Sequence, residues 1–386
     1  MIDLTRLPAF GMPFQSVEVD PGLDWLTDSA CALEAPPDGV GEPPAEARWS
    51  GRELRTGTGA VVAPRIVRVR ERFYRMYYTQ LLARPGSPTG ALDFASSTGR
   101  ILSATSADGE TWVPEPGVRL SAAAGGAGEF RVIVGDVLPL DAGLRRWRMY
   151  YECSDEPRLD ATRILSALSE DGGLTWRTEP GVRLGAPHRS FVTPRIMFLP
   201  YGGLRLLCGE RGRGIISARS VDGGLTFAEE DGIRIASDGP HDSATAYAPE
   251  VVGLAGGGYA MYYAGYESPD RAHILRADSA DGLEWRKAAR PAVSPGGSGL
   301  NAAKCSEMCL VALPTAPGER PSYRLLYEAC DGTAPRNRGV WRIVSAAPCA
   351  PERVPPGDSS PCCSRSASPP DSVPPSVRAA RSPGPR

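Results

Sequence analysis

A short turn motif recurs four times along the chain, and it constrains the fold more than any other feature of the sequence. Each copy has a serine, an Asp-Gly pair that starts two residues later, and a closing aromatic residue; the copies are residues 106–112, 169–176, 220–227 and 279–285. Their aspartates are 63, 51 and 59 residues apart. Asp-Gly between apolar runs indicates a β-hairpin, because glycine adopts the positive φ that tight hairpin turns need. The sequence therefore predicts repeated units of short antiparallel strands.

Two further motifs show that the units number five. A strand-like run such as Arg-Met-Tyr-Tyr occurs at residues 75–78, 148–151, 205–208, 260–263 and 324–327. An opening motif such as Ala-Pro-Arg-Ile precedes each run, at residues 63–66, 134–137, 193–196, 248–251 and 305–308. Four strands per unit, repeated radially, are typical of a β-propeller. We predict an all-β, five-bladed β-propeller of four-stranded blades.

The ends of the chain differ from this body in composition. Residues 1–59 read as an N-terminal arm and loop, and residues 60–348 as the propeller. Since the fifth unit lacks its last strand, we expect residues 14–19 to supply it and close the ring. The last 36 residues contain 10 prolines, 8 serines and no aromatic residue, so they cannot bury enough apolar surface to order themselves. We therefore predict a disordered tail over residues 349–386.

Composition excludes several classes of protein. With 43 basic and 45 acidic residues, the chain has no field that would attract phosphate, so we expect no nucleic-acid partner. No run approaches the roughly 18 apolar residues that span a membrane, and residues 1–14 do not read as a secretory signal. Nine cysteines without a CxxC pair indicate reduced thiols in the cytoplasm rather than disulfides or zinc. We predict a cytoplasmic protein with no membrane partner, metal or cofactor.

Beyond these patterns, the units resemble a known group of enzymes. Residues 259–263, 273–279 and 281–285 are similar to units of the five-bladed propeller glycosidases of glycoside hydrolase families 43, 32, 62 and 68. The resemblance covers about residues 60–346. Residues 169–176 and 220–227 also match the Asp-box of sialidases, S-x-D-x-G-x-T-W, although sialidases have six blades. The resemblance implies that the turn aspartates lie at the rim and serve folding. They are Asp108, Asp171, Asp222 and Asp281.

The resemblance also implies an active site on the axis, with carboxylates just before the proline of the opening motif. At that position this sequence has Ala63, Val134, Thr193, Ala248 and Cys305, none of which is acidic. The hydrolytic carboxylates of the family therefore do not carry over residue by residue.

Each opening motif has a charged residue two positions after the one just named. They are Arg65, Asp136, Arg195, Glu250 and Glu307. A buried charge without a partner is very costly, so we expect these residues to converge and pair at the axis. Two interpretations stay open: a structural ring of ion pairs that closes the axial channel, or a polar pocket for a substrate.

Other polar residues fall at the same predicted end of the strands. His188 and His241 lie on equivalent loops before the third and fourth units, where an imidazole can act as acid or base. Three glutamates end second strands, and neighbouring arginines are expected to lower the pKa of one of them, Glu210. These glutamates are Glu152, Glu210 and Glu328.

We weigh two functions. The first is a glycosidase-like enzyme that acts on a sugar or sugar-like polar small molecule in the axial pocket. Its candidate catalytic residues are Asp136, Glu250, Glu307, His188 and His241, and its candidate substrate-binding residues are Arg65, Arg195, Glu210 and Glu152. The alternative is a non-hydrolytic propeller, either a carbohydrate- or ligand-binding protein or an enzyme recruited to cyclisation or elimination in a biosynthetic pathway. Two carboxylates about 5 to 9.5 Å apart would favour hydrolysis, and a mainly apolar cavity would favour the alternative.

Overall fold

The computed structural model describes residues 16–34, 60–83, 97–122, 130–155, 162–199, 202–316, 318–333 and 340–349. The chain divides into the units Met1–Cys349 and Ala350–Arg386, and everything below concerns the first. The prediction of a disordered tail falls almost wholly outside the described residues. Within them every regular element is a β-strand, so the all-β prediction is confirmed. The described residues contain no helix long and apolar enough to cross a lipid bilayer.

Most strands pair antiparallel in five consecutive sets within the described ranges. The first set is β3 (Ala60–Arg70), β4 (Phe73–Ala83) and β5 (Ser97–Ser106) with the short β6 (Val113–Pro114) and β7 (Leu120–Ser121). The second is β8 (Arg131–Pro139), β9 (Trp147–Ser154), β10 (Arg163–Ser169) and β11 (Arg177–Thr178). The third is β12 (Phe191–Phe198), β13 (Leu204–Glu210), β14 (Gly214–Ser220), β15 (Ala228–Glu229) and β16 (Ile235–Ala236). The fourth is β17 (Thr245–Leu254), β18 (Tyr259–Ser268), β19 (Arg271–Ser279) and β20 (Arg286–Lys287). The fifth is β21 (Lys304–Ala312), β22 (Tyr323–Cys330), β23 (Trp341–Pro348) and, from the start of the chain, β2 (Trp25–Leu33).

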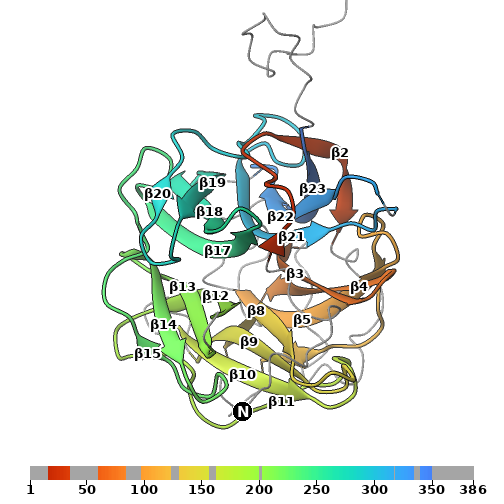
Figure 1. Cartoon of the computed structure of the whole chain (residues 1–386), viewed down its shortest axis with the longest axis vertical. Helices are drawn as coiled ribbons and strands as arrows, with labels where there is room; N and C mark the ends of the chain where they lie inside the picture. The colour runs from red at the N-terminus through yellow and green to blue at the C-terminus, as the bar shows by residue number, and fades with distance from the viewer. Residues whose placement is uncertain are drawn as a thin grey trace, which may run out of the picture. The chain divides into compact units, whose positions relative to one another are not determined.

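The first strands of the sets surround a common centre. Strand β3 contacts β8, β8 contacts β12, β12 contacts β17, β17 contacts β21, and β21 contacts β3 again. Figure 1 shows the sets following one another around this centre. The opening motifs therefore all face one axis, because each lies in a first strand.

The strand that completes the fifth set differs from our expectation. We expected residues 14–19, of which 16–19 are described, but Ser16–Val17 forms β1 and pairs parallel with β17. Strand β2 pairs antiparallel with β23 instead, beginning with Trp25 opposite Pro348. Its sequence, WLTDSACAL, has few β-branched residues, so its strand structure depends on the exposed edge of β23 rather than on local propensity.

The turn motifs connect each set to its predecessor. The Asp171 carboxylate accepts hydrogen bonds from the backbone N–H groups of Leu174 and Thr175, at 3.1 and 2.9 Å. The aromatic ring that closes this turn, Trp176, packs edge-on against Tyr77 of the first set at 5.8 Å between centroids. Arg75 donates to the carbonyl of Gly172 in the same turn at 2.6 Å. Arg75 and Tyr77 of the second strand thus hold the turn of the following set.

Each first strand is interrupted by a β-bulge at its opening motif. The register shifts between Val62 and Arg65, and the equivalent shift occurs in the other four first strands. Three of the bulge residues, each followed by proline, have positive φ values of 51° to 55°: Ala63, Thr193 and Ala248. A bulge re-aims the side chains on either side of it. Residues before the bulge and residues after it can therefore serve different sites.

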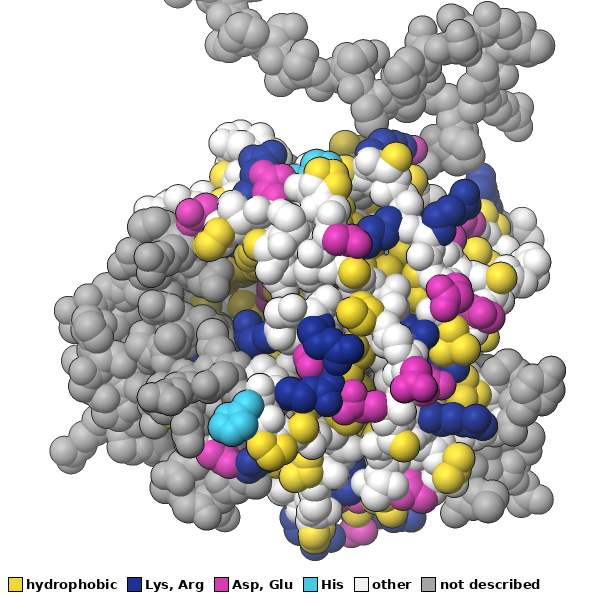
Figure 2. All heavy atoms as spheres, turned by 90° about the vertical axis from the view of Figure 1, so that its left-hand side faces the viewer, with side chains coloured by type: hydrophobic (Ala, Val, Ile, Leu, Met, Phe, Trp, Pro, Cys, Tyr) yellow, Lys and Arg dark blue, Asp and Glu magenta, His cyan; other side chains and the backbone are white. Residues whose placement is uncertain are grey.

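The described surface carries charges of both signs. On the face shown in Figure 2, Lys and Arg side chains are interspersed with Asp and Glu side chains, and no large area of that face has one sign. This mixture agrees with the formal net charge of -2.

Candidate functional site

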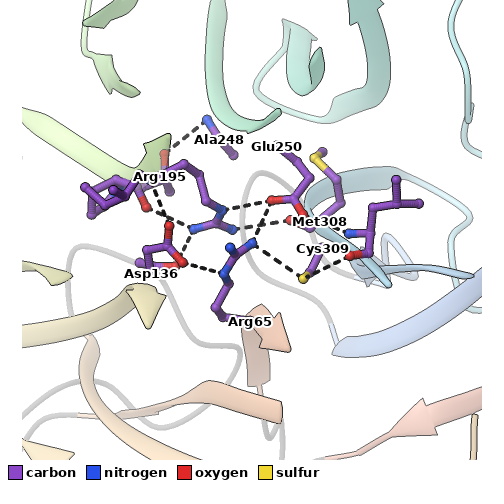
Figure 3. Close-up of polar contacts among 12 residues, drawn as sticks. Arg65, Asp136, Arg195, Ala248, Glu250, Met308 and Cys309 are labelled. Atoms are coloured by element: carbon purple, nitrogen blue, oxygen red, sulfur yellow. Dashed lines mark hydrogen bonds and ion pairs between the residues drawn. The ribbon is translucent and has the colours of Figure 1, made fainter. Parts of the chain in front are cut away.

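Four of the five predicted axial residues converge. We call Arg65, Asp136, Arg195 and Glu250 the axial charge cluster. Arg65 lies between the two acids, with its Nε 2.6 Å from Asp136 Oδ1 and a terminal nitrogen 2.8 Å from Glu250 Oε2. Arg195 Nε lies 3.2 Å from the same Glu250 oxygen. Figure 3 shows the four side chains pointing toward one another from different sets.

Backbone groups fill the remaining positions around this cluster. Asp136 Oδ2 accepts from the N–H of Ile196 at 2.7 Å, and Glu250 Oε1 accepts from the N–H of Leu310 at 3.0 Å. Arg195 donates to the carbonyls of Gly135 and Met308. The cluster thus links all the sets through the carboxylates, the guanidinium groups and the backbone of the first strands.

The axial charge cluster is buried and electrically balanced. Its four members are at most 4% exposed, and two cations face two anions. Burial opposes the charge on Arg65, but the carboxylates of Asp136 and Glu250 outweigh it and raise its pKa. Each member of the cluster already contacts a side chain of opposite charge. This arrangement fits the structural interpretation that we left open.

The fifth predicted residue, Glu307, has a different place. In the first set, Tyr77 is the third residue of the Arg-Met-Tyr-Tyr run, and it stands opposite Arg65. In the fifth set the third residue of the corresponding run is Leu326, and it stands opposite Cys309. The Cys309 thiol accordingly lies beside Arg65, 3.6 Å from a guanidinium nitrogen. Cys309 is therefore the equivalent of Arg65.

This pairing corrects the alignment of the fifth opening motif by two residues. Glu307, two residues before Cys309, matches Ala63, two residues before Arg65. It therefore occupies the position that precedes the proline of the opening motif. Our sequence alignment placed Cys305 at this position of the fifth unit, and by that alignment none of the five units had an acidic residue there. The motif escaped notice because Met308 replaces the proline that marks three of the other motifs.

A cavity of about 200 Å³ opens beside the bulges, and side chains from all five sets line it. Its polar lining consists of Glu152, Glu210, Arg211, Thr245, Glu307 and Glu328. Its apolar and aromatic lining includes Val62, Leu81, Ile133, Val192, Tyr247, Tyr266 and Trp341. Of the predicted site residues, Glu152, Glu210 and Glu307 therefore reach the cavity. Arg65, Asp136, Arg195 and Glu250 do not line it.

All four cavity glutamates are buried, and two of them, Glu152 and Glu328, accept hydrogen bonds from the backbone of the next set. Glu152 accepts from the N–H of Thr193 at 3.0 Å. Glu328 accepts from the N–H of Ala63 at 3.1 Å and from the Ser306 hydroxyl at 2.6 Å. Both glutamates thus hold the bulge of the next set. By contrast, Glu307 Oε2 is buried and has no hydrogen-bond partner among the described residues.

Glu152, Glu307 and Glu328 all have raised pKa values. Burial raises the pKa of Glu328 to about 7, and the charge of Glu152 adds to this effect. Burial also raises the pKa of Glu307 well above its usual range, with further contributions from the carboxylates of Glu328 and Glu152. Burial raises the pKa of Glu152 as well. Glu307, whose pKa is raised well above its usual range, is therefore the cavity carboxyl best suited to hold and donate a proton.

Glu210 has the opposite character. Burial acts to raise its pKa, but Arg189 and Arg213 outweigh burial and lower it. Arg189 Nε lies 2.7 Å from one Glu210 oxygen, and a terminal nitrogen of Arg213 lies 2.7 Å from the other. The cavity thus places a carboxyl group of lowered pKa together with carboxyl groups of raised pKa. Carboxyl groups with opposed pKa shifts are the usual basis for assigning an acid and a base.

The two predicted histidines do not line the cavity. His188 is exposed and has a φ of 59°. His241 lies before β17, with its Nδ1 3.4 Å from Glu267 Oε2. The same Glu267 oxygen lies 3.1 Å from Nε2 of His273, a residue to which sequence reasoning gave no role.

Sequence reasoning missed the aromatic lining of the cavity. Tyr247, Tyr266 and Trp341 come from three different strands, and Lys304 lies 5.8 Å from the Tyr266 ring centroid and 5.5 Å from that of Trp341. These residues carry no shared motif. Their common signal is position alone, at the ends of strands that the repeat already places around one centre.

Comparison with known proteins identifies the fold. No protein-family model and no curated protein sequence matches the chain. Solved structures do: a glycoside hydrolase with a TM-score of 0.61 and 13% identity covers 83% of this chain and 92% of its own. A thermostable family-43 glycoside hydrolase has a TM-score of 0.56 and 16% identity over 74% of this chain and 89% of its own. A family 117 glycoside hydrolase from the marine bacterium Zobellia galactanivorans has a TM-score of 0.55 and 16% identity, over 84% and 90%. The chain therefore has the fold of glycoside hydrolases.

Proposed function

We propose that the chain is a five-bladed β-propeller whose strand sets are the blades and whose cavity is an acid–base active site of the glycosidase type. Support for the blades comes from the five antiparallel sets and from the closed circle of contacts among their first strands. The Ser-x-Asp turns are the Asp-boxes of this propeller and serve folding. The solved glycoside hydrolases supply the fold-level analogy.

The observation that carries the catalytic proposal is the unpaired oxygen of Glu307. A buried polar atom without a partner costs free energy, so its persistence beside a cavity is typical of a group that bonds to a ligand. Glu307 also occupies the position where the glycosidases that this chain resembles place carboxylates. Its raised pKa makes it the general acid, which donates a proton to the oxygen of the leaving group.

The second catalytic group is Glu210. Its lowered pKa keeps it ionised, so it can take a proton from water or attack the sugar carbon directly. In glycosidases the separation of the two carboxyl groups decides between these courses, at about 5 Å for retention and up to about 9.5 Å for inversion. Glu152 and Glu328 act as positioning residues that keep the proton on Glu307.

The axial charge cluster takes the structural role. Asp136 and Glu250 are therefore not the acid and base in this proposal, and Arg65 and Arg195 do not bind substrate. Their polar atoms already bond to one another and to the backbone. The cluster instead holds the first strands together next to the bulges that carry Glu307 and its neighbours.

The lining also suggests the class of substrate. Glutamates and Arg211 gather with Thr245, while Val62, Leu81, Ile133, Val192 and Trp341 offer an apolar wall. A substrate that joins a sugar to an aryl or alkyl group would match both parts. The apolar wall equally favours our alternative function, acid-catalysed cyclisation or elimination of a largely apolar molecule.

A panel of aryl glycosides tests the proposal with the full-length protein. We expect hydrolysis of at least one member, and Glu307→Gln should lower turnover by at least about 100-fold, the low end of general acid–base effects. Glu284→Gln, at an exposed site on a turn, is the matched control and should leave turnover unchanged. Binding of a glycoside without any turnover would instead support the ligand-binding alternative, and equal turnover in wild type and Glu307→Gln would remove Glu307 from the catalytic role.

The cytoplasmic location stays a proposal. It is supported by five free thiols of the described ranges, those of Cys31, Cys153, Cys208, Cys305 and Cys309. The expectation of no nucleic-acid partner likewise stays a prediction, supported by the formal net charge of -2.

A further inference from the structure

Three potential metal ligands gather at one corner of the fourth strand set. They are His241, in the loop before β17, Glu267, in β18, and His273, in β19. Their ligand atoms all lie within 4.8 Å of one another. The chain has three histidines in all. Two of them contact this single carboxylate although they are 32 positions apart in the sequence.

The two distances from the carboxylate to the imidazoles are those expected between ligands of one metal ion. One oxygen, Glu267 Oε2, lies 3.4 Å from His241 Nδ1 and 3.1 Å from His273 Nε2. Zinc binds histidine nitrogen and carboxylate oxygen at about 2.0 to 2.2 Å in tetrahedral geometry, which places neighbouring ligand atoms roughly 3.3 Å apart. A small movement of the partly exposed His241 ring would complete this triangle.

Further residues orient the ligands from outside. Ser294 Oγ lies 3.1 Å from Nδ1 of His273, the nitrogen that faces away from Glu267. Arg271 Nε lies 3.1 Å from the other Glu267 oxygen, Oε1. Metal-binding histidines typically bond through their second nitrogen to an orienting group, and metal-binding carboxylates are hydrogen-bonded in turn. His273 is held most firmly, because its side chain is only 3% exposed.

We propose that His241, Glu267 and His273 bind a divalent transition-metal ion of the Zn²⁺ class. Two imidazoles and one carboxylate match the ligand preferences of such an ion better than those of Mg²⁺ or Ca²⁺, which favour oxygen. Three protein ligands leave a coordination position for water or substrate. The site belongs to the cavity end of the fourth set, because Glu267 follows Tyr266 in β18 and both Tyr266 and Pro269 line the cavity. It revises our expectation that the chain binds no metal.

The test uses the full-length protein, stripped with a chelator and titrated with Co²⁺ and Zn²⁺ under reducing conditions. We expect one equivalent of Co²⁺ to give a visible spectrum of four- or five-coordinate cobalt without a thiolate charge-transfer band, and Zn²⁺ to displace it. His241→Ala should abolish this spectrum, and Ser294→Ala should weaken binding by about 10- to 100-fold. His188→Ala, at an exposed histidine outside the cluster, is the control and should bind as wild type does.

Two outcomes would overturn the proposal. One is the absence of stoichiometric binding to the folded wild type, and the other is binding that His241→Ala and Glu267→Gln leave intact or that shows thiolate ligands. Because His273 is buried and its replacement can unfold the protein, the test depends on His241, whose side chain is 34% exposed. Melting temperature measured with and without Zn²⁺ gives an independent readout, since an ion that binds only the folded state raises it.

Discussion

Arg65 Nε lies 2.6 Å from Asp136 Oδ1, so a first-strand guanidinium of the first set is bound to a first-strand carboxylate of the second. Asp136 is fully buried, and its oxygens also accept from the N–H groups of Val137 and Ile196. One carboxylate therefore contacts three donors from three different sets. Two acceptor oxygens are needed to satisfy all three.

We predict that Asp136→Asn destabilises the protein and leaves turnover of the folded fraction nearly unchanged. The amide has one acceptor oxygen, so its NH₂ group would face one of the donors, and Arg65 would lose an anionic partner. Breaking one side of a buried ion pair costs about 3 to 5 kcal/mol. Chemical unfolding monitored by fluorescence gives the free energy, with Glu284→Gln as the exposed control. A large fall in turnover at unchanged stability would return Asp136 to the list of catalytic residues.

The turn aspartates give a second prediction. Asp171→Ala should lower stability by about 1 to 3 kcal/mol, because the N–H groups of Leu174 and Thr175 lose their acceptor. Trp176 should then pack less well against Tyr77, so near-ultraviolet circular dichroism should change at the same time. The kinetic constants of the folded protein should stay as they are, because Asp171 does not line the cavity. Lost turnover with an unchanged melting temperature would contradict this structural role.

A third prediction concerns the pH dependence of turnover. The carboxylate of Glu152 helps to raise the pKa of Glu307, so Glu152→Gln should lower that pKa. Since a general acid works only when protonated, the fall of kcat/KM at high pH should move to lower pH. The amide keeps an oxygen to accept from Thr193, so the fold should survive. An unshifted profile would show that Glu307 is not the group that titrates.

The repeated strands and turns could be predicted well from the sequence, because a hairpin turn and a β-strand each depend on a few adjacent residues. The Asp-Gly turns and the Tyr-rich second strands are read from a few adjacent residues. Strand β2 could not be predicted, because its pairing with β23 joins residues more than 300 positions apart. Its sequence, with a single β-branched residue, gives no local sign of that pairing.

The site was predicted in part, and the error lay in one bulge. Glu307 was among the predicted site residues, but counting from Cys305 placed it at the position of Arg65. The structure aligns Cys309 with Arg65, and a bulge around Glu307 turns its carboxylate toward the cavity. Bulges depend on the partner strand, so the sequence of one strand does not reveal them. The apolar lining, such as Val62 and Val192, was missed for the same reason.

The last prediction links the cavity to stability. Burial raises the pKa of Glu328 to about 7, whereas an unfolded chain has a glutamate pKa of about 4.3. Between these values the folded protein binds more protons than the unfolded chain, so its stability falls as the pH rises from about 4.5 to about 7 and then levels off. Glu307 contributes with the same sign.

Glu328→Gln should therefore flatten this part of the pH profile, because the amide does not titrate and still accepts from Ala63. The loss of stability over that range should shrink by an amount of the order of 3 kcal/mol. The measurement is the free energy of unfolding at several pH values from 4.5 to 8, for wild type, Glu328→Gln and the exposed control Glu284→Gln. If wild type and Glu328→Gln lose stability with the same slope, the carboxyl of Glu328 is ionised over this range in the folded protein, and burial does not raise its pKa.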